Sequence, residues 1–231
     1  MNWAPRKLRR FSAFWLCAIG LSTILLPGCS TTMPWDRKEY TSIITPAMRI
    51  SAIQESASRA SNGDSTEQQR LVEELAMQIR TESDPLVRAA IQESLGDIQV
   101  PLARDVLIAG LNDDDLDVKL ICCRKLGDRG EPENVPILRK LLEGGEVLDV
   151  KLAATDALGN IRSTESVKTL SIALKDRDPA LQYAGVEALK QLSDQDFGND
   201  VAAWQKFADA GQITVKSEIS VAESVMQMSP F

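Results

Sequence analysis

The chain contains no histidine among its 231 residues. Histidine is the commonest general base near neutral pH and the commonest protein ligand of transition metals. Its absence excludes Ser-His-Asp and Cys-His catalysis, because both mechanisms need an imidazole. The chain also lacks a phosphate-binding loop and a dinucleotide-binding fingerprint. We therefore predict a protein that is not an enzyme and that holds no metal and no cofactor.

Aromatic residues and clusters of basic residues are also scarce. Aromatics make up 5% of the chain, and 26 Lys and Arg face 33 Asp and Glu, for a net charge of −7. Residues 1–28 hold four basic residues and no acid, so the remainder has 22 basic and 33 acidic residues, a net charge of −11. Binding to phosphates needs clustered Lys and Arg. This balance argues against a nucleic-acid partner and favours an acidic, soluble surface.

The four cysteines do not form a disulfide framework. Cys17 and Cys29 belong to an apolar leader, whereas Cys122 and Cys123 are neighbours in a predicted helix. Neighbouring side chains on a helix point about 100° apart, so a bridge between them would require local distortion. We expect Cys122 to fill a core position as a small hydrophobic residue.

A short acidic run, residues 113–117, has Asp at alternate positions, as at the start of a calcium-binding EF-hand loop. The sixth position of that loop needs Gly and the twelfth needs Glu, but the chain has Val118 and Arg124 there. The alternative is that these Asp residues cap a helix and favour the positive end of its dipole. We predict the capping role.

The first 28 residues have the organisation of a signal peptide. A basic segment, residues 6–10, precedes an apolar stretch of 16 residues, Phe11 to Leu26, which is short for a membrane span. The stretch ends in Leu26-Pro27-Gly28-Cys29. This motif resembles the lipobox of bacterial lipoproteins, although Pro27 stands where that family usually has a small or β-branched residue. An ordinary signal peptide and an uncleaved anchor are the alternatives.

The resemblance implies cleavage before Cys29 and attachment of lipid to its thiol. The protein is then expected in the cell envelope, facing the periplasm, on the outer membrane or on the outer face of the inner membrane. Residues 29–44 are polar and predict a tether between the lipid and the first helix.

One helical pattern occurs four times further along the chain. A Val or Leu opens each copy, a Leu follows eight residues later, and the copies are 31, 32 and 31 residues apart. The opening residues are Val87, Val118, Val150 and Leu181, and the leucines are Leu95, Leu126, Leu158 and Leu189. Apolar or small residues at steps 0, 3, 4, 7 and 8 predict one buried face of an amphipathic helix. Gly96, Gly127 and Gly159 follow three of these leucines and suit helix C-termini.

A second helix precedes each copy, and breakers or capping residues separate the two. The unit is therefore a helical hairpin, and a fixed period of this length indicates a solenoid. We predict an all-α fold, an α-α superhelix of about four hairpins at residues 66–97, 98–128, 129–161 and 162–193, within a repeat domain covering residues 45–211.

These copies resemble HEAT-like repeats, of the short kind also found in phycobilisome-lyase-type proteins. The residues that carry the resemblance run from Asp84-Pro85-Leu86-Val87-Arg88 through Leu95-Gly96, together with their later echoes. The resemblance implies stacked hairpins with an extended binding surface. The missing histidine separates the chain from HEAT-like hydroxylases that bind iron through histidine.

Both ends of the repeats need caps. A helix from Pro46 to Ala60 is predicted to cover the first repeat, and residues 194–211 the last one. In this second cap Phe197 precedes Trp204 and Phe207, which share one helix face, so we expect the three aromatics to close the exposed core. Residues 212–231 are predicted to be a mobile tail.

Equivalent positions of the four copies hold Arg88, Lys119, Lys151 and Gln182. Asp84 and Asp115 precede the first two cations by four residues, a spacing that favours ion pairs within a helix. We predict a structural ladder; a ridge that binds a partner is the alternative.

The function that these features favour is a protein-interaction scaffold whose concave helix face holds an unknown protein or peptide. The alternative is a lyase-like or accessory protein acting on a tetrapyrrole or a cofactor enzyme. The export signal and the missing histidine argue against this alternative. A structural envelope component without a discrete partner is the third.

Overall fold

The computed structural model describes residues 44–61 and 63–210. The predicted signal peptide, Cys29 with nearly all of the tether, and the predicted tail lie outside these residues. The described part forms α-helices and one 3₁₀ turn, and it contains no β-strand. In chain order the elements are α1 (Pro46–Ser61), α2 (Ser65–Gln78), α3 (Pro85–Gly96), α4 (Pro101–Gly110), α5 (Leu116–Asp128), η1 (Pro132–Asn134), α6 (Val135–Glu143), α7 (Leu148–Asn160), α8 (Thr164–Lys175), α9 (Pro179–Leu192) and α10 (Val201–Ala210).

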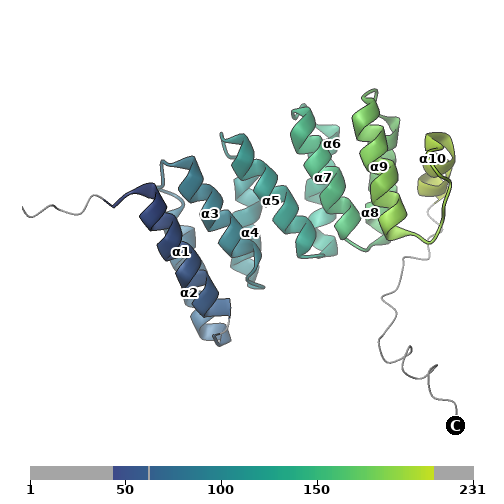
Figure 1. Cartoon of the computed structure of the whole chain (residues 1–231). Helices are drawn as coiled ribbons and strands as arrows, with labels where there is room; N and C mark the ends of the chain where they lie inside the picture. The colour runs from purple at the N-terminus through teal and green to yellow at the C-terminus, as the bar shows by residue number, and fades with distance from the viewer. Residues whose placement is uncertain (1–43, 62, 211–231) are drawn as a thin grey trace, which may run out of the picture. The chain divides into compact units, whose positions relative to one another are not determined.

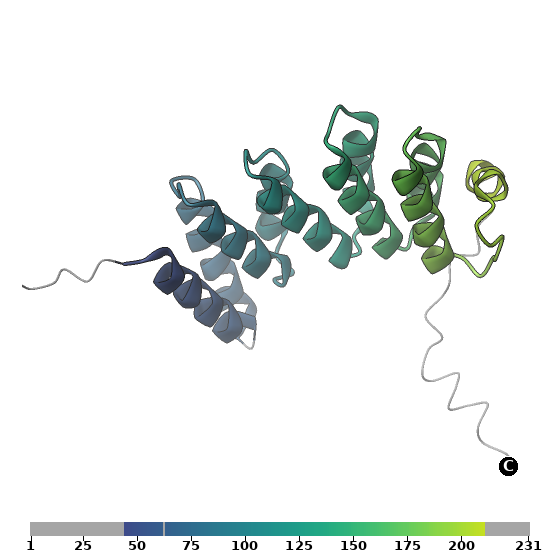
Figure 2. The same ribbon diagram turned by 45° about the horizontal axis from the view of Figure 1, so that its top comes forward.

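The helices lie in two layers (Figures 1 and 2). Helices α1, α3, α5, α7 and α9 contact one another in sequence and form what we call the B layer. Helices α2, α4, α6, α8 and α10 form the A layer behind it, in which α2 contacts α4, α6 contacts α8 and α8 contacts α10. The prediction of an all-α solenoid is confirmed: α2/α3, α4/α5, α6/α7 and α8/α9 are its hairpins. Within residues 44–210, the B-layer helix α1 precedes them and the A-layer helix α10 follows them.

Aspartates and prolines decide where the B-layer helices begin. The side chains of Asp84, Asp115 and Asp178 each accept a hydrogen bond from a backbone N–H in the first turn of α3, α5 and α9. Pro85 and Pro179 occupy the first helical position, where no N–H is needed. Helix α7 follows Val147 and begins without a side-chain cap.

The repeated anchors form the core. The opening Val or Leu of each copy is at most 1% exposed, and the Leu eight residues later is fully buried. One part of the predicted stripe differs: the residues at step 3 are only partly buried, because they lie at the outer edge of the B layer. They are Ala90, Ile121, Ala153 and Ala184.

The glycines predicted at helix C-termini do lie at or next to the last residues of α3, α5 and α7, but close packing and not a left-handed cap accounts for Gly127 and Gly159. Gly127 and Gly159 do not have the positive φ of a helix-ending glycine, which Gly130 and Gly198 show in the described residues. A Cβ on Gly127 would lie 2.6 Å from Cα of Ala157, on the next B-layer helix. A Cβ on Gly159 would lie 3.0 Å from Cβ of Ala188. These glycines let successive B-layer backbones approach closely.

The buried apolar residues fall into two clusters, which meet between α3 and α5. One cluster runs from Ile53 to Ala103 and the other from Leu107 to Ala208. Two buried polar side chains, Gln92 and Lys125, lie at this junction. Lys125 donates to Asp97 over 2.8 Å, whereas Gln92 donates to the carbonyl oxygen of Val106 over 3.3 Å. The hairpins are therefore joined there by polar as well as apolar contacts.

Replacing Gly127 with Ala should destabilise the fold, because the new methyl group would press on the α7 backbone. Overpacking of this kind costs about 1–3 kcal/mol. Unfolding by urea, followed by circular dichroism, measures the change. Gly145→Ala is the matched control, since a Cβ there meets nothing within 4 Å. Equal stability of the two variants would contradict the role assigned to Gly127.

Candidate partner-binding face

The predicted cations lie at the starts of the B-layer helices, and each pairs with an acid in the turn of the following hairpin. Arg88 donates to both carboxylate oxygens of Asp113, over 2.7 and 2.8 Å. The other pairs of this ladder are Lys119 with Glu146 at 3.7 Å, Lys151 with Asp176 at 3.5 Å, and Arg49 of α1 with Glu82. The ladder therefore links each repeat to the next.

The prediction that Asp84 and Asp115 are the partners within the helix was wrong. Both carboxylates instead accept backbone N–H groups at the starts of α3 and α5. Within the acidic run, Asp113 is bonded to Arg88 and Asp115 is a helix cap. These two carboxylates thus have structural partners, as the capping interpretation of the run expects.

The charges of the ladder stabilise each other. The hydrogen bond from Arg88 lowers the pKa of Asp113, although partial burial opposes the shift, and the same bond raises the pKa of Arg88. Gln182, at the fourth position, donates to the backbone oxygen of Asp176 over 2.8 Å. The acids of the ladder lie in the turns after α2, α4, α6 and α8, and the corresponding turn after α10 lies outside the described residues.

A different surface of the B layer is hollowed. A cleft of about 670 Å³ is lined by residues of α3, α5 and α7 and by none from the A layer. Its lining residues are Leu86, Ala89, Asp117, Leu120, Ile121, Arg124, Asp149, Leu152 and Ala153. Most of the lining is aliphatic. Leu86 is 64% exposed, and Tyr183, at the corresponding position of α9 to Leu152, is 59% exposed.

Sequence reasoning predicted a partner on a helix face but named none of these residues. The detectable signal was the position two residues after each anchor, which holds Ala89, Leu120, Leu152 and Tyr183. These residues stand outside the predicted stripe of the buried face. The first three pack against the edge of the core and stay partly exposed, whereas Tyr183 is exposed. A periodic apolar row outside the core stripe indicates a second apolar surface.

The C-terminal aromatics lie together over the last hairpin. The ring centroid of Phe197 is 5.0 Å from that of Trp204 and 5.9 Å from that of Phe207. Trp204 is fully buried, and its indole N–H donates to the oxygen of Gly198 over 3.0 Å. This arrangement leaves no free face of Trp204 on which a ligand could stack.

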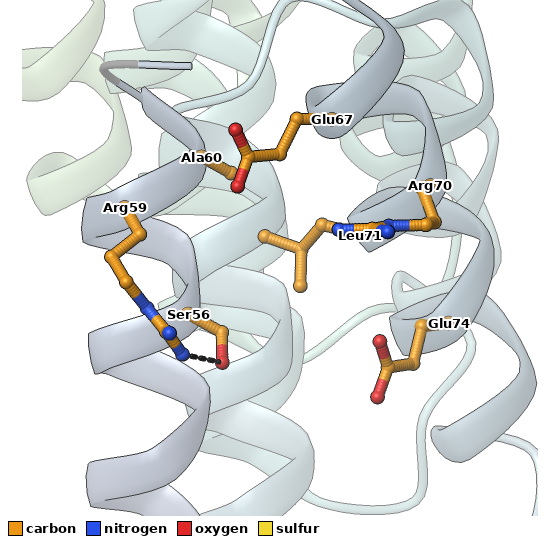
Figure 3. A pocket seen from close by; sticks show the side chains of 7 residues that line it. All are labelled: Ser56, Arg59, Ala60, Glu67, Arg70, Leu71 and Glu74. Atoms are coloured by element: carbon orange, nitrogen blue, oxygen red, sulfur yellow. Dashed lines mark hydrogen bonds between the residues drawn. The ribbon is translucent and has the colours of Figure 1, made fainter. Parts of the chain in front are cut away.

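A second hollow lies between α1 and α2 (Figure 3). It has a volume of about 170 Å³, and the exposed side chains of Arg59, Glu67, Arg70 and Glu74 surround it. Two positive and two negative charges balance there, and Arg59 donates to Ser56 over 3.4 Å. The hollow therefore has no preference for a charged ligand.

The remaining candidates for chemistry are buried or dispersed. Cys122 and Cys123 are free and buried; burial raises both pKa values, that of Cys123 to about 12, so both stay protonated and unreactive at neutral pH. In residues 44–61 and 63–210, His, Cys, Asp and Glu do not gather in groups of three that could hold a metal ion. Within the same ranges, no helix is both long and apolar enough to cross a bilayer.

Replacing Arg88 with Gln should lower stability by about 1–2 kcal/mol, because Asp113 would lose its charged partner. A carboxyl whose pKa is lowered by folding adds stability above its unfolded pKa, about 3.9, and loses it as pH falls through the lower folded value. The difference between wild type and Arg88→Gln should therefore be full at pH 7 and shrink below about pH 4. Thermal unfolding across this range measures it. A pH-independent difference would contradict the ion pair.

The family comparison agrees with this architecture. Residues 72–158 match the model of the HEAT repeats. Among solved structures, the chain is similar to the complex of CpcE and CpcF of phycocyanin lyase from Nostoc sp. PCC7120, with 20% identity, a TM-score of 0.48, and coverage of 74% of this chain and 71% of that one. It is also similar to an engineered protein, with 19% identity, a TM-score of 0.44, and coverage of 74% and 92%. No curated protein matches the sequence. Residues 72–158 therefore match HEAT repeats, and the hairpin α8/α9 that follows them continues the same two-layer stacking.

Proposed function

We propose that this protein is a non-enzymatic scaffold that holds a protein or peptide partner against the B-layer face. The apolar cleft across α3, α5 and α7 carries this proposal. Large exposed apolar patches with a polar rim mark interaction sites on soluble proteins. Leu120 and Leu152 lie side by side in the cleft on successive helices, in a position where a partner can bury both.

The composition of the cleft supports binding in preference to catalysis. Aliphatic side chains offer a partner apolar area to bury, but they supply no nucleophile and no general base. The chain has no histidine to supply one, and its buried thiols lie away from the cleft lining. A tetrapyrrole-related activity remains the alternative, and a coloured ligand that co-purifies with the protein would favour it.

We further propose that a lipid on Cys29 holds the scaffold on a membrane of the cell envelope, facing the periplasm. The basic segment, the apolar stretch and the Leu-Pro-Gly-Cys motif support this location. Acyl chains anchor a protein by about 0.8 kcal/mol for each methylene that they bury. The 16 residues between Cys29 and Pro46 can span at most about 55 Å, which leaves room for a partner beside the membrane.

Photocrosslinking in native membranes tests the scaffold. A photoreactive residue at position 120 or 152 should crosslink to a discrete protein, which mass spectrometry identifies. The same residue at position 140 or 168, both exposed on the A layer, is the control and should give no such product. Crosslinks to the same protein from both layers, or none from the B layer, would contradict the proposed face.

The anchor has its own test. Replacing Cys29 with Ala should abolish incorporation of a labelled fatty acid and leave the precursor uncleaved, because the thiol that accepts the lipid is gone. Cys17→Ala should retain both, since this cysteine lies within the leader. Incorporation of the labelled fatty acid into the Cys29→Ala protein would contradict the lipoprotein assignment.

A further inference from the structure

The charges beside the cleft point to the chemistry of its occupant. Resting on the proposed function, we infer that the B-layer face binds a basic, amphipathic segment of a partner protein. Apolar side chains of this segment enter the cleft, and its Lys and Arg side chains pair with carboxylates along both edges.

Equivalent positions of the repeats form three parallel rows on this face. The central row is apolar and consists of Ala89, Leu120, Leu152 and Tyr183. The row three residues earlier is Leu86, Asp117, Asp149 and Ala180, and the row four residues later is Glu93, Arg124, Asp156 and Glu187. Residues three and four apart are neighbours on a helix surface. Carboxylates therefore border the apolar row on both sides.

Three of these carboxylates are available to a partner. Asp117, Asp149 and Asp156 are exposed, and none of them forms an ion pair or a side-chain hydrogen bond with another residue between 44 and 210 that the structure describes. The acids of the ladder, by contrast, are all paired. Arg124, the cation in the cleft lining, is bonded to Glu93. The edges of the cleft thus carry uncompensated negative charge.

The helix dipole explains two of these three exposed carboxylates but not the third. Asp117 and Asp149 lie in the first turns of α5 and α7, where the helix dipole favours a negative charge. Asp156 lies in the second half of α7, where the dipole does not favour it. A positively charged partner would supply the favourable interaction that the helix does not give Asp156.

Other occupants match this face less well. A second copy of the chain would place one acidic edge against another, which costs free energy. Residues 211–231 of the chain contain one Lys and two Glu, so they lack the positive charge that the edges call for. Phosphates and anionic lipids would be repelled. A basic segment with apolar side chains satisfies both the row and its edges.

Binding of a designed peptide tests the inference. The probe is a fluorescent 18-residue helical peptide of Leu and Lys, and the comparison is the same peptide with Glu in place of Lys. The full lipid-anchored chain is placed in nanodiscs of zwitterionic lipid, and empty nanodiscs correct for binding of the peptide to lipid. Anisotropy at 50 and 300 mM salt gives the affinity.

The decisive variant is Asp117→Asn, Asp149→Asn and Asp156→Asn together. It should weaken binding of the Lys peptide about tenfold at low salt and less at high salt, because exposed charges are screened. The control, Asp105→Asn, Glu133→Gln and Glu165→Gln, removes the same charge from exposed positions of the A layer and η1 and should leave the affinity within about twofold. Leu120→Ala with Leu152→Ala should weaken binding at both salt concentrations.

Two results would overturn the inference: equal binding of the Glu peptide, or equal weakening by the control variant, which would show only a general attraction to an acidic protein. If position 120 or 152 still crosslinks to a discrete partner in membranes, then the scaffold function stands and only the basic character of the partner is wrong. If neither crosslinks nor saturable peptide binding is found, both proposals fail.

Discussion

The close approach of successive B-layer helices is the constraint on which the rest of this structure depends. Gly127 places the backbone of α5 so near Ala157 that no side chain fits between them. Such contact brings the repeated Val and Leu anchors into one continuous core, because each hairpin has only its neighbours against which to bury its apolar face. It also sets the distance at which a cation of one repeat meets the turn of the next. The ladder from Arg49 to Asp176 follows from that spacing.

The same constraint explains the helices at the two ends of the described repeats. A repeat without a neighbour would expose its core, so α1 covers the B layer at one end and Trp204 of α10 covers the A layer at the other. The ladder changes at the last repeat that the structure describes. Gln182 stands there at the position of the cation and donates to the backbone oxygen of Asp176 instead of pairing with a carboxylate.

The period and the anchors predict the hairpins well, because the spacing of Val87, Leu95 and their equivalents within one helix already places them on a single face, which is buried. They do not predict which residues meet across repeats. Arg88 has Asp84 nearby in sequence, yet it bonds to Asp113, since capping already occupies Asp84 and stacking brings the next turn within reach. For the same reason Gly127 was predicted to end a helix, although its role depends on Ala157 thirty residues away. Stacking distances cannot be deduced from a single repeat.

Because the repeats are stacked, equivalent residues of successive repeats form a row along the surface. The residue type at one position of the repeat therefore decides the chemistry of a whole face. At the ladder, the row of cations meets a row of acids, and the charges are neutralised within the fold. Along the cleft, Leu120 and Leu152 pack against the core on one side and stay partly exposed on the other, and Asp156 beside them has no ion-pair or hydrogen-bond partner in the described residues. Exposed apolar groups and unpaired charges on such a surface are stabilised when another molecule covers the apolar groups and brings opposite charges. The contrast between these two faces, built from the same repeat, therefore argues that one face holds the solenoid together and the other holds a partner.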